Sequence, residues 1–235
     1  MKLAKLIISV LVIMLILALA AVSVGYFRSH AHAAEPNRLS SDAASHKTRT
    51  SSTDRYQLDS SQSKFIAHAM AGGLLWFEGH DHLVAVKDFS GQAQFSPDQI
   101  NQASLQITAK AASMIETSSV FTDQQKQIID KELREIVLQP DQFPEIIFRS
   151  TQVSGTKSTN DQYDLKITGD LTLHGVTRQI TIPTKLTLNG NDLRAVGEFS
   201  IDRSDYKVKA TSAVHGLVQV RDKIKFNFDI VGHRS

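Results

Sequence analysis

The chain has 235 residues, with 26 Lys and Arg against 24 Asp and Glu and a formal net charge of +2. This near balance argues against a nucleic-acid-binding protein, which needs a concentrated basic face. The sequence contains no cysteine, so an exported domain made from it has no disulfide bonds and needs a core large enough to stand alone.

An apolar segment opens the chain. Residues 6–27 carry no charge, and Arg28 follows them. Roughly 20 apolar residues span a bilayer, whereas the apolar region of a signal peptide is shorter, about 7–15 residues. The sequence Ala31-His32-Ala33, however, has the form of a signal cleavage site. For residues 1–28 two interpretations stay open: an uncleaved membrane anchor with its N-terminus inside, or an export signal cleaved after Ala33.

Under either interpretation, the rest of the chain is expected to be exported. Residues 29–54 are polar, rich in Ser, Ala, Thr and His, and show no periodicity, which predicts a flexible linker. The remaining residues, 55–235, form the predicted folded domain. We therefore expect a protein in the periplasm or at the extracytoplasmic face, anchored to the inner membrane by residues 6–27.

Segments with strand character follow one another from Tyr56 onward. Between Leu193 and Ile201, for example, small or apolar residues alternate with mostly polar ones. Because side chains point to alternate faces of a strand, each such segment has one apolar face and one wet face. Many short strands of this kind predict a sandwich or a barrel. The predicted strands are Tyr56–Leu58, Lys64–Met70, His82–Phe95, Ala103–Ala109, Glu145–Val153, Tyr163–Leu173, Arg178–Leu188, Leu193–Ile201, Ala213–Val220 and Lys223–Val231.

One segment breaks the strand pattern. Thr122 and Gln125 have the spacing of a capping box, which marks the start of a helix. Apolar residues between Ile128 and Ile136 then recur at helical spacing. We predict a single helix over Asp123–Val137 that crosses the sheet and buries its apolar stripe at the end of the barrel.

The clearest strand pair runs from Asp164 to Leu188. The parity of its apolar residues reverses at His174-Gly175, which predicts an antiparallel hairpin with a short turn there. His174 is accordingly predicted to be a turn residue.

Several motifs of this domain, in this order and spacing, resemble those of the YceI-like family. The hairpin Gly169–Thr177 is the strongest match, and the resemblance covers Arg55 to Gly232. The other matching segments are Tyr56–Asp59, Asp88–Gly91, Asp130–Arg134, Phe143–Thr151 and Ile201–Tyr206. Two features depart from the family: Glu132 stands where it usually has His, and Glu135–Gln139 lacks its Asp-Phe-Phe run.

The resemblance implies an antiparallel, eight-stranded, lipocalin-like barrel that holds a polyisoprenoid, a quinone or a similar long-chain amphiphile. It implies storage or transport of that lipid rather than enzymatic catalysis, with no cofactor, and it leaves a homodimer open. Twelve residues on the apolar faces are the expected ligand contacts. They are Phe65, Phe95, Leu105, Ile107, Phe148, Leu171, Leu173, Ile182, Leu186, Phe199, Phe226 and Phe228.

Two other interpretations of the sequence stay open. His80 and His82 fall on one side of a strand and are candidates for a shared metal ion, with His68, His174 and His215 as further candidates. Zinc sites usually need three or four protein ligands, and only two of these histidines are close in sequence. The second interpretation is a structural barrel whose apolar side chains fill the interior.

Overall fold

The computed structural model describes residues 53–213 and 217–235. The predicted segment 1–28, nearly all of the predicted linker 29–54, and His215 lie outside the described residues. Within the described ranges, no helix is both long enough and apolar enough to cross a bilayer. The strands are β1 (Asp54–Gly72), β2 (His82–Val86), β3 (Phe89–Phe95), β4 (Ser104–Lys110), β5 (Met114–Glu116), β6 (Glu145–Lys157), β7 (Gln162–Leu173), β8 (Val176–Asn189), β9 (Asp192–Asp202), β10 (Ser212–Ala213) and β11 (Val218–Arg234).

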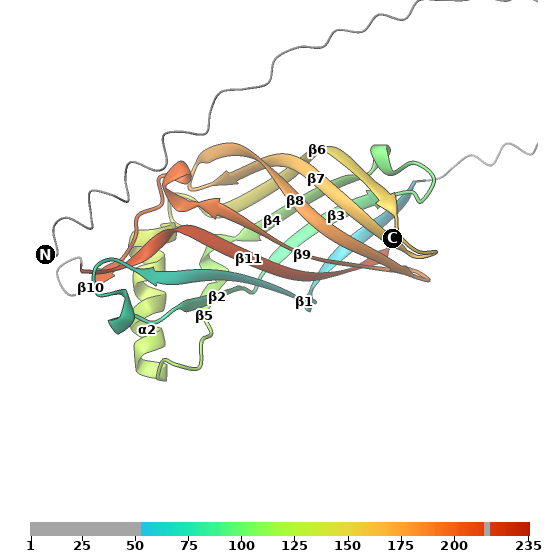
Figure 1. Cartoon of the computed structure of the whole chain (residues 1–235). Helices are drawn as coiled ribbons and strands as arrows, with labels where there is room; N and C mark the ends of the chain where they lie inside the picture. The colour runs from blue at the N-terminus through green and yellow to red at the C-terminus, as the bar shows by residue number, and fades with distance from the viewer. Residues whose placement is uncertain (1–52, 214–216) are drawn as a thin grey trace, which may run out of the picture. The chain divides into compact units, whose positions relative to one another are not determined.

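Eight of these strands close into an antiparallel barrel (Figure 1). The order around it is β1-β3-β4-β6-β7-β8-β9-β11, and β11 pairs back onto β1, with Phe65 opposite Phe228. This closure confirms the predicted eight-stranded barrel. Because β11 pairs with β1, the ring of eight strands has no open edge where its first and last strands meet.

Two pairs of predicted strands are joined and one predicted strand is divided. In the C-terminal pair, β11 contains the last residues of the predicted strand Ala213–Val220 and all of Lys223–Val231. Tyr56–Leu58 and Lys64–Met70 belong to the single strand β1, whose pairing with β11 shifts register between Asp59 and Lys64. The predicted strand His82–Phe95 is instead β2 and β3. The backbone N–H groups of Lys87 and Asp88 donate to Ser113, so the chain leaves the ladder at this point.

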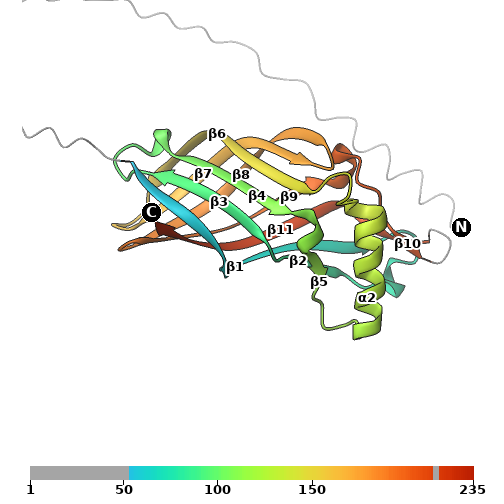
Figure 2. The same cartoon turned by 180° about the vertical axis from the view of Figure 1, so that it is seen from behind.

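The break changes the partners of the two strands. β3 pairs with the first part of β1, whereas β2 pairs with its second part and with β5. The barrel wall is therefore extended by β2 and β5 on one side, next to the helix (Figure 2).

The predicted helix is present as α2 (Asp123–Glu132), which continues as the π-helical segment η4 (Leu133–Leu138). The capping box is confirmed: the Thr122 hydroxyl accepts from the Gln125 N–H, and the Gln125 side chain accepts from the Thr122 N–H. The segment ends at Gln139, whose φ is 47°. Short 3-10 turns complete the described structure: η1 (Trp76–Glu78), η2 (Ile100–Gln102), η3 (Ala111–Ser113) and η5 (Arg203–Tyr206).

The barrel is packed solid at one end. Tyr56 and Tyr163 are each 1% exposed, and the ring of Tyr163 lies edge-on to Phe95 with centroids 4.9 Å apart. Leu186 lies opposite Tyr163 in the β7–β8 ladder and is also buried. These residues lie near the start of β1 and β7 and near the end of β3 and β8, so they fill the end of the barrel away from α2 (Figure 1).

Candidate ligand cavity

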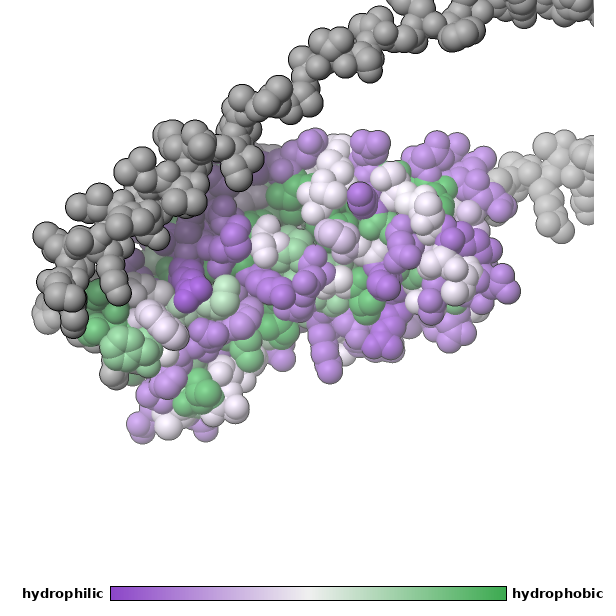
Figure 3. All heavy atoms as spheres, viewed as in Figure 1, coloured by the Kyte–Doolittle hydropathy of each residue, from purple (hydrophilic) through white to green (hydrophobic). Residues whose placement is uncertain are grey.

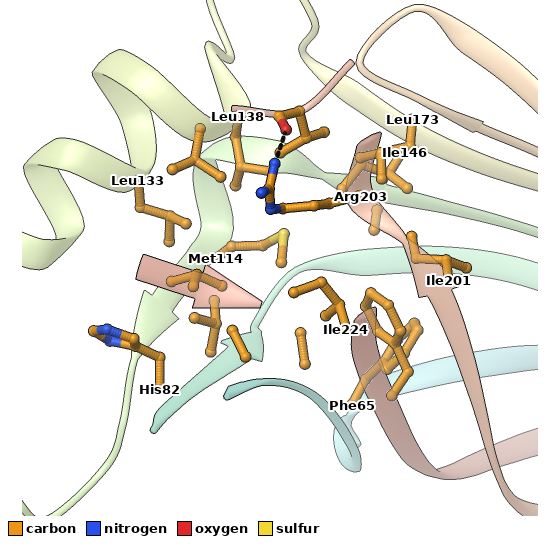
Figure 4. A pocket seen from close by; sticks show the side chains of 18 of the residues that line it. Phe65, His82, Met114, Leu133, Leu138, Ile146, Leu173, Ile201, Arg203 and Ile224 are labelled. Carbon is orange, nitrogen blue, oxygen red and sulfur yellow. Dashed lines mark hydrogen bonds between the residues drawn. The ribbon is translucent and has the colours of Figure 1, made fainter. Parts of the chain in front are cut away.

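The other half of the barrel encloses a cavity of about 570 Å³, which lies within the range typical of small-molecule sites. Its wall is built from seven of the eight barrel strands, all but β3, together with β2, β5, α2 and η4 (Figure 4). The barrel interior is therefore hollow at the end nearer α2 and filled by side chains at the other end.

The alternation of each strand decides which side chains face the cavity. Odd-numbered residues line it from β1, β4, β7 and β9, and even-numbered residues line it from β6, β8 and β11, with Gln219 of β11 as an exception. The cavity wall is therefore the inner face of these seven strands. The residues between these positions face outward, and hydrophilic side chains cover much of the outer surface seen in Figure 3. Its barrel-strand members include Phe65, Ala67, Ala69, Leu105, Ile107, Ile146, Phe148, Ile167, Leu171, Leu173, Ile180, Ile182, Ala195, Phe199, Ile201, Ile224, Phe226, Phe228 and Ile230.

An aromatic cluster forms one side of this wall. The rings of Phe199 and Phe226 stack with centroids 4.9 Å apart and an interplanar angle of 9°. Phe65 meets Phe226 and Phe228 edge-on, at 6.0 and 6.4 Å. These four rings, hereafter the aromatic wall, come from three neighbouring strands, β9, β11 and β1. They offer a rigid apolar surface to a hydrocarbon chain.

Ten of the twelve residues predicted to contact a ligand line the cavity. Phe95 and Leu186 do not line it, although ligand contact stays a prediction for these two as well. Their parity is right, but they lie in the packed end of the barrel, where Phe95 is 3% exposed and covered by Tyr163. Ligand contact itself stays a prediction for the other ten: Phe65, Leu105, Ile107, Phe148, Leu171, Leu173, Ile182, Phe199, Phe226 and Phe228.

The helix covers the cavity loosely. Ile129 and Leu133 of the predicted apolar stripe line it, together with Leu138, and Leu133 and Leu138 are buried. Ile136 of the same stripe does not line the cavity and is 41% exposed, so the stripe is buried only in part. Ile128 also lines the cavity and yet is 61% exposed. A lining side chain with this much exposure marks the place where the cavity opens to solvent, beside α2.

Only His82 lies on a strand, as the first residue of β2, whereas His80 lies in the loop before it, so the two do not share a strand as predicted. Both line the cavity and both touch the ring of Phe121, which stacks on His82 at 5.1 Å. His82 Nδ1 lies 2.9 Å from Oε2 of Glu116, a carboxylate with no exposed surface. The described residues hold no group of three or more His, Cys, Asp or Glu side chains able to bind a metal ion. The metal hypothesis thus gains one carboxylate partner for His82 but no third ligand.

Glu116 is held as an anion by its hydrogen bonds. Burial disfavours the charged form, but donation from His82, Ser118 and Leu83 outweighs it and lowers the pKa of Glu116 below its ordinary value. The carboxylate therefore fixes the chain between β5 and α2 against β2. It positions one wall of the cavity.

The remaining candidate histidines have structural surroundings. His174 occupies the β7–β8 turn, as predicted, with φ of 50° followed by 72° at Gly175, which is the pattern of a type I′ hairpin. Its Nε2 lies 2.9 Å from the Gln139 side-chain oxygen and its ring lies 4.0 Å from Phe143, and burial lowers its pKa. His68 pairs with Asp81 at 3.0 Å.

Three charged residues line the cavity: Glu132, Arg203 and Lys209. Glu132 is the residue that departs from the family's usual His, whereas Arg203 and Lys209 were not predicted to be site residues. A signal for Arg203 was present, because it continues the odd-numbered inward face of β9 two residues beyond Ile201. Nothing in the local sequence marks Met114, which reaches the cavity through the short strand β5.

The comparisons with known proteins agree with this architecture. A family model described as the YceI-like domain matches residues 56–232. This chain belongs to the YceI-like domain family. Protein YceI of Escherichia coli O17:K52:H18 (strain UMN026 / ExPEC) and Protein YceI of Shigella flexneri are each 36% identical over 121 residues, or 51% of this chain. The match spans 54% of each relative's length, about half.

Two solved structures share the fold of this YceI-like domain. Burkholderia cenocepacia BcnA superposes with a TM-score of 0.57 at 22% identity, covering 74% of this chain and 98% of BcnA. A polyisoprenoid-binding domain from Saccharophagus degradans superposes with a TM-score of 0.51 at 11% identity, covering 77% of this chain and 98% of that domain. At such identities the likeness establishes the fold.

Proposed function

We propose that this YceI-like domain binds a long-chain isoprenoid lipid or quinone, or a comparable amphiphile, and stores or carries it without altering it chemically. The observation that carries the proposal is the cavity, whose barrel wall is made almost entirely of aliphatic and aromatic side chains. The polyisoprenoid-binding domain of the Saccharophagus degradans protein, which shares the fold, supports the same class of ligand.

The chemistry of the wall favours a hydrocarbon chain. Transfer of apolar surface out of water contributes about 25 cal/mol per Å², so a long chain gains affinity without polar contacts along its length. The aromatic wall gives such a chain a surface to lie against, and the opening beside Ile128 gives it a way in. A hollow interior also argues against a purely structural barrel with a filled core.

The proposal places the domain in the cell envelope. Its support is the uncharged segment 6–27, which is long enough to anchor or export the chain. Fractionation of cells producing the full chain tests this: the protein is expected in the membrane fraction, with the barrel domain digested by protease added to spheroplasts. Protection of that domain until the cells are lysed would overturn the placement.

The binding proposal is tested on the full chain purified from its host membranes. Native mass spectrometry is expected to show a co-purifying species whose fragments carry the repeating mass of isoprene. Adding an isoprenoid quinone to delipidated protein is expected to raise its melting temperature, because a ligand that binds the native state alone stabilises it. Absence of both the adduct and the shift would refute the proposal.

The metal hypothesis is tested in parallel. Elemental analysis after loading with Zn²⁺ compares the wild type with a His80→Ala, His82→Ala variant. A metal lost from the variant together with lipid binding would revive the metal-dependent interpretation. Equal metal content in the two proteins removes those histidines as ligands.

A further inference from the structure

One charged side chain enters the apolar cavity from its wall. Arg203 begins η5 directly after β9, and its guanidinium reaches toward Leu133 and Leu138 (Figure 4). Only 21% of the Arg203 side chain is exposed. Placing a permanently charged group beside buried leucines is costly unless its hydrogen-bonding groups find partners.

The protein satisfies this guanidinium only in part. Nη1 donates to the carbonyl oxygen of Val208 at 2.9 Å. Nε is buried and has no hydrogen-bond partner among the described residues, since Oδ1 of Asp222 lies 3.9 Å away. Both carboxylate oxygens of Asp222 accept from Ser204, at 3.0 and 2.7 Å. A guanidinium carries five N–H groups, so most of the donor capacity of Arg203 is left over.

The charges around Arg203 favour an anionic partner. Lys209 also lines the cavity and is exposed, and Glu132 on α2 is the one carboxylate among the lining residues. The ion pairs of residues 53–213 and 217–235 do not join Glu132 to either cation. The lining residues thus include two cations and one carboxylate, while the aromatic wall is uncharged. Outside the lining, Asp222 lies at the limit of ion-pair distance from Arg203, at 3.9 Å, and its oxygens are already bound by Ser204.

We propose that Arg203 recognises the head of the bound amphiphile, and that the preferred head carries anionic oxygen, as in a phosphate or a carboxylate. The inference rests on the proposed function, since it assigns the polar end of the same ligand. A phosphate or carboxylate accepts two parallel N–H bonds from one guanidinium, which matches the unused donors. The tail then extends from Arg203 along the aromatic wall, and the head stays near the opening.

The experiment compares ligands that differ only in the head. Binding of a polyprenyl phosphate and of the polyprenol with the same tail is measured by quenching of the fluorescence of Trp76 and the tyrosines, or by calorimetry. A long-chain fatty acid and its alcohol form a second pair, which separates a phosphate preference from a carboxylate preference. The wild type is expected to bind the anionic member of at least one pair about 10- to 100-fold tighter, the range for hydrogen bonds to charged groups.

Three variants test whether Arg203 is the source of the preference for an anionic head. Arg203→Met is expected to abolish it while leaving polyprenol affinity within about twofold, which also shows that the cavity is intact. Arg203→Lys keeps a charge without the planar fork and is expected to keep part of the preference. Arg178→Met is the matched control, because the exposed Arg178 donates to the Asp205 carbonyl of the same η5 segment from outside.

The outcomes separate the two proposals. Equal wild-type affinity for the anion and the alcohol in both pairs, or an Arg203→Met variant with the full preference, overturns the role of Arg203 and leaves lipid binding standing. Failure of the wild type to bind any of the four ligands overturns the proposed function, and the assignment of the head with it.

Discussion

Nδ1 of His82 lies 2.9 Å from Oε2 of Glu116, and this contact joins the first residue of β2 to the last residue of β5. The same carboxylate accepts the backbone N–H groups of Leu83, at 3.1 Å, and of Ser118, at 2.7 Å. One buried side chain therefore holds together the strand pair that extends the barrel wall and the chain leading into α2.

Removing this carboxylate is expected to loosen the covered end of the barrel. Glu116→Ala leaves the Leu83 and Ser118 N–H groups without their acceptor, so it should lower the free energy of unfolding by about 3 kcal/mol. Urea denaturation measures the change. Glu198→Ala is the control, because its exposed pair with Lys225 is expected to contribute less than about 1 kcal/mol. Equal losses in the two variants would contradict the role of Glu116.

The same group predicts a loss of stability in acid. Because the folded-state pKa of Glu116 is lower than its unfolded value of about 4.3, its contribution is present above that value and is lost as the pH falls through the folded pKa. The stability difference between wild type and Glu116→Gln should therefore be constant above about pH 5 and should shrink as the pH falls from about 5 to 3. A difference that stays constant over this range would argue against the buried carboxylate as its source.

For His233, near the C-terminus, we expect the opposite pH dependence: its contribution to stability is lost as the pH rises. It lies between Asp192, at 2.8 Å, and Asp59, at 3.3 Å, and its hydrogen bonds to these two carboxylates raise its pKa. Its stabilising contribution is complete below the unfolded pKa of about 6.5 and disappears as the pH rises through the folded value. NMR titration should place the midpoint above 6.5, with the signal assigned by His233→Gln. A midpoint at or below 6.5 would contradict the prediction.

The β7–β8 turn should tolerate no side chain at Gly175. An added Cβ there would lie 2.8 Å from Cε1 of Phe143, and φ is already +72°. Gly175→Ala should therefore cost about 2 kcal/mol or more, the sum of a strained backbone and a steric clash. Gly190→Ala is the control: its φ is +61°, but its Cβ would meet nothing within 4 Å. Thermal unfolding should show the smaller loss at Gly190.

Filling the cavity should weaken ligand binding. Ala195 lines the cavity and is half-buried, so Ala195→Phe places a ring in the space proposed for the lipid tail and should lower quinone affinity at least tenfold. Val196→Phe, on the outer face of the same strand, adds a similar ring outside the cavity. Retained affinity in Ala195→Phe, with the melting temperature of the unliganded protein unchanged, would argue that the tail lies elsewhere.

The strand faces could be predicted because their cause is local. Side chains alternate on any strand, so the parity of Phe226 and Phe228, or of Leu171 and Leu173, is readable without knowing the partners. The capping box of Thr122 and the turn at His174-Gly175 likewise depend on only a few neighbouring residues. Family resemblance then supplied the closure into eight strands, which periodicity alone left open between a barrel and a sandwich.

Parity does not tell which inward residues touch one another and which border empty space. Phe95 and Phe199 share the same kind of position, yet Phe95 is covered by Tyr163 while Phe199 faces the cavity. The difference depends on how far each residue lies from the packed end, and that depth follows from the register of strands that are distant in sequence.

The roles of the charged residues were harder to predict from the sequence than the strand faces. Arg203, the first residue of η5, continues the inward alternation of β9, but a charge at that position more often marks the point where a strand leaves the core. Its partly satisfied guanidinium, the Glu116 carboxylate between two strands, and the opening beside α2 all arise from long-range contacts. Residues and their periodicity determined a β domain whose strands each have one apolar face. The cavity and its charged lining were decided by tertiary packing, because both are enclosed by elements far apart in the chain.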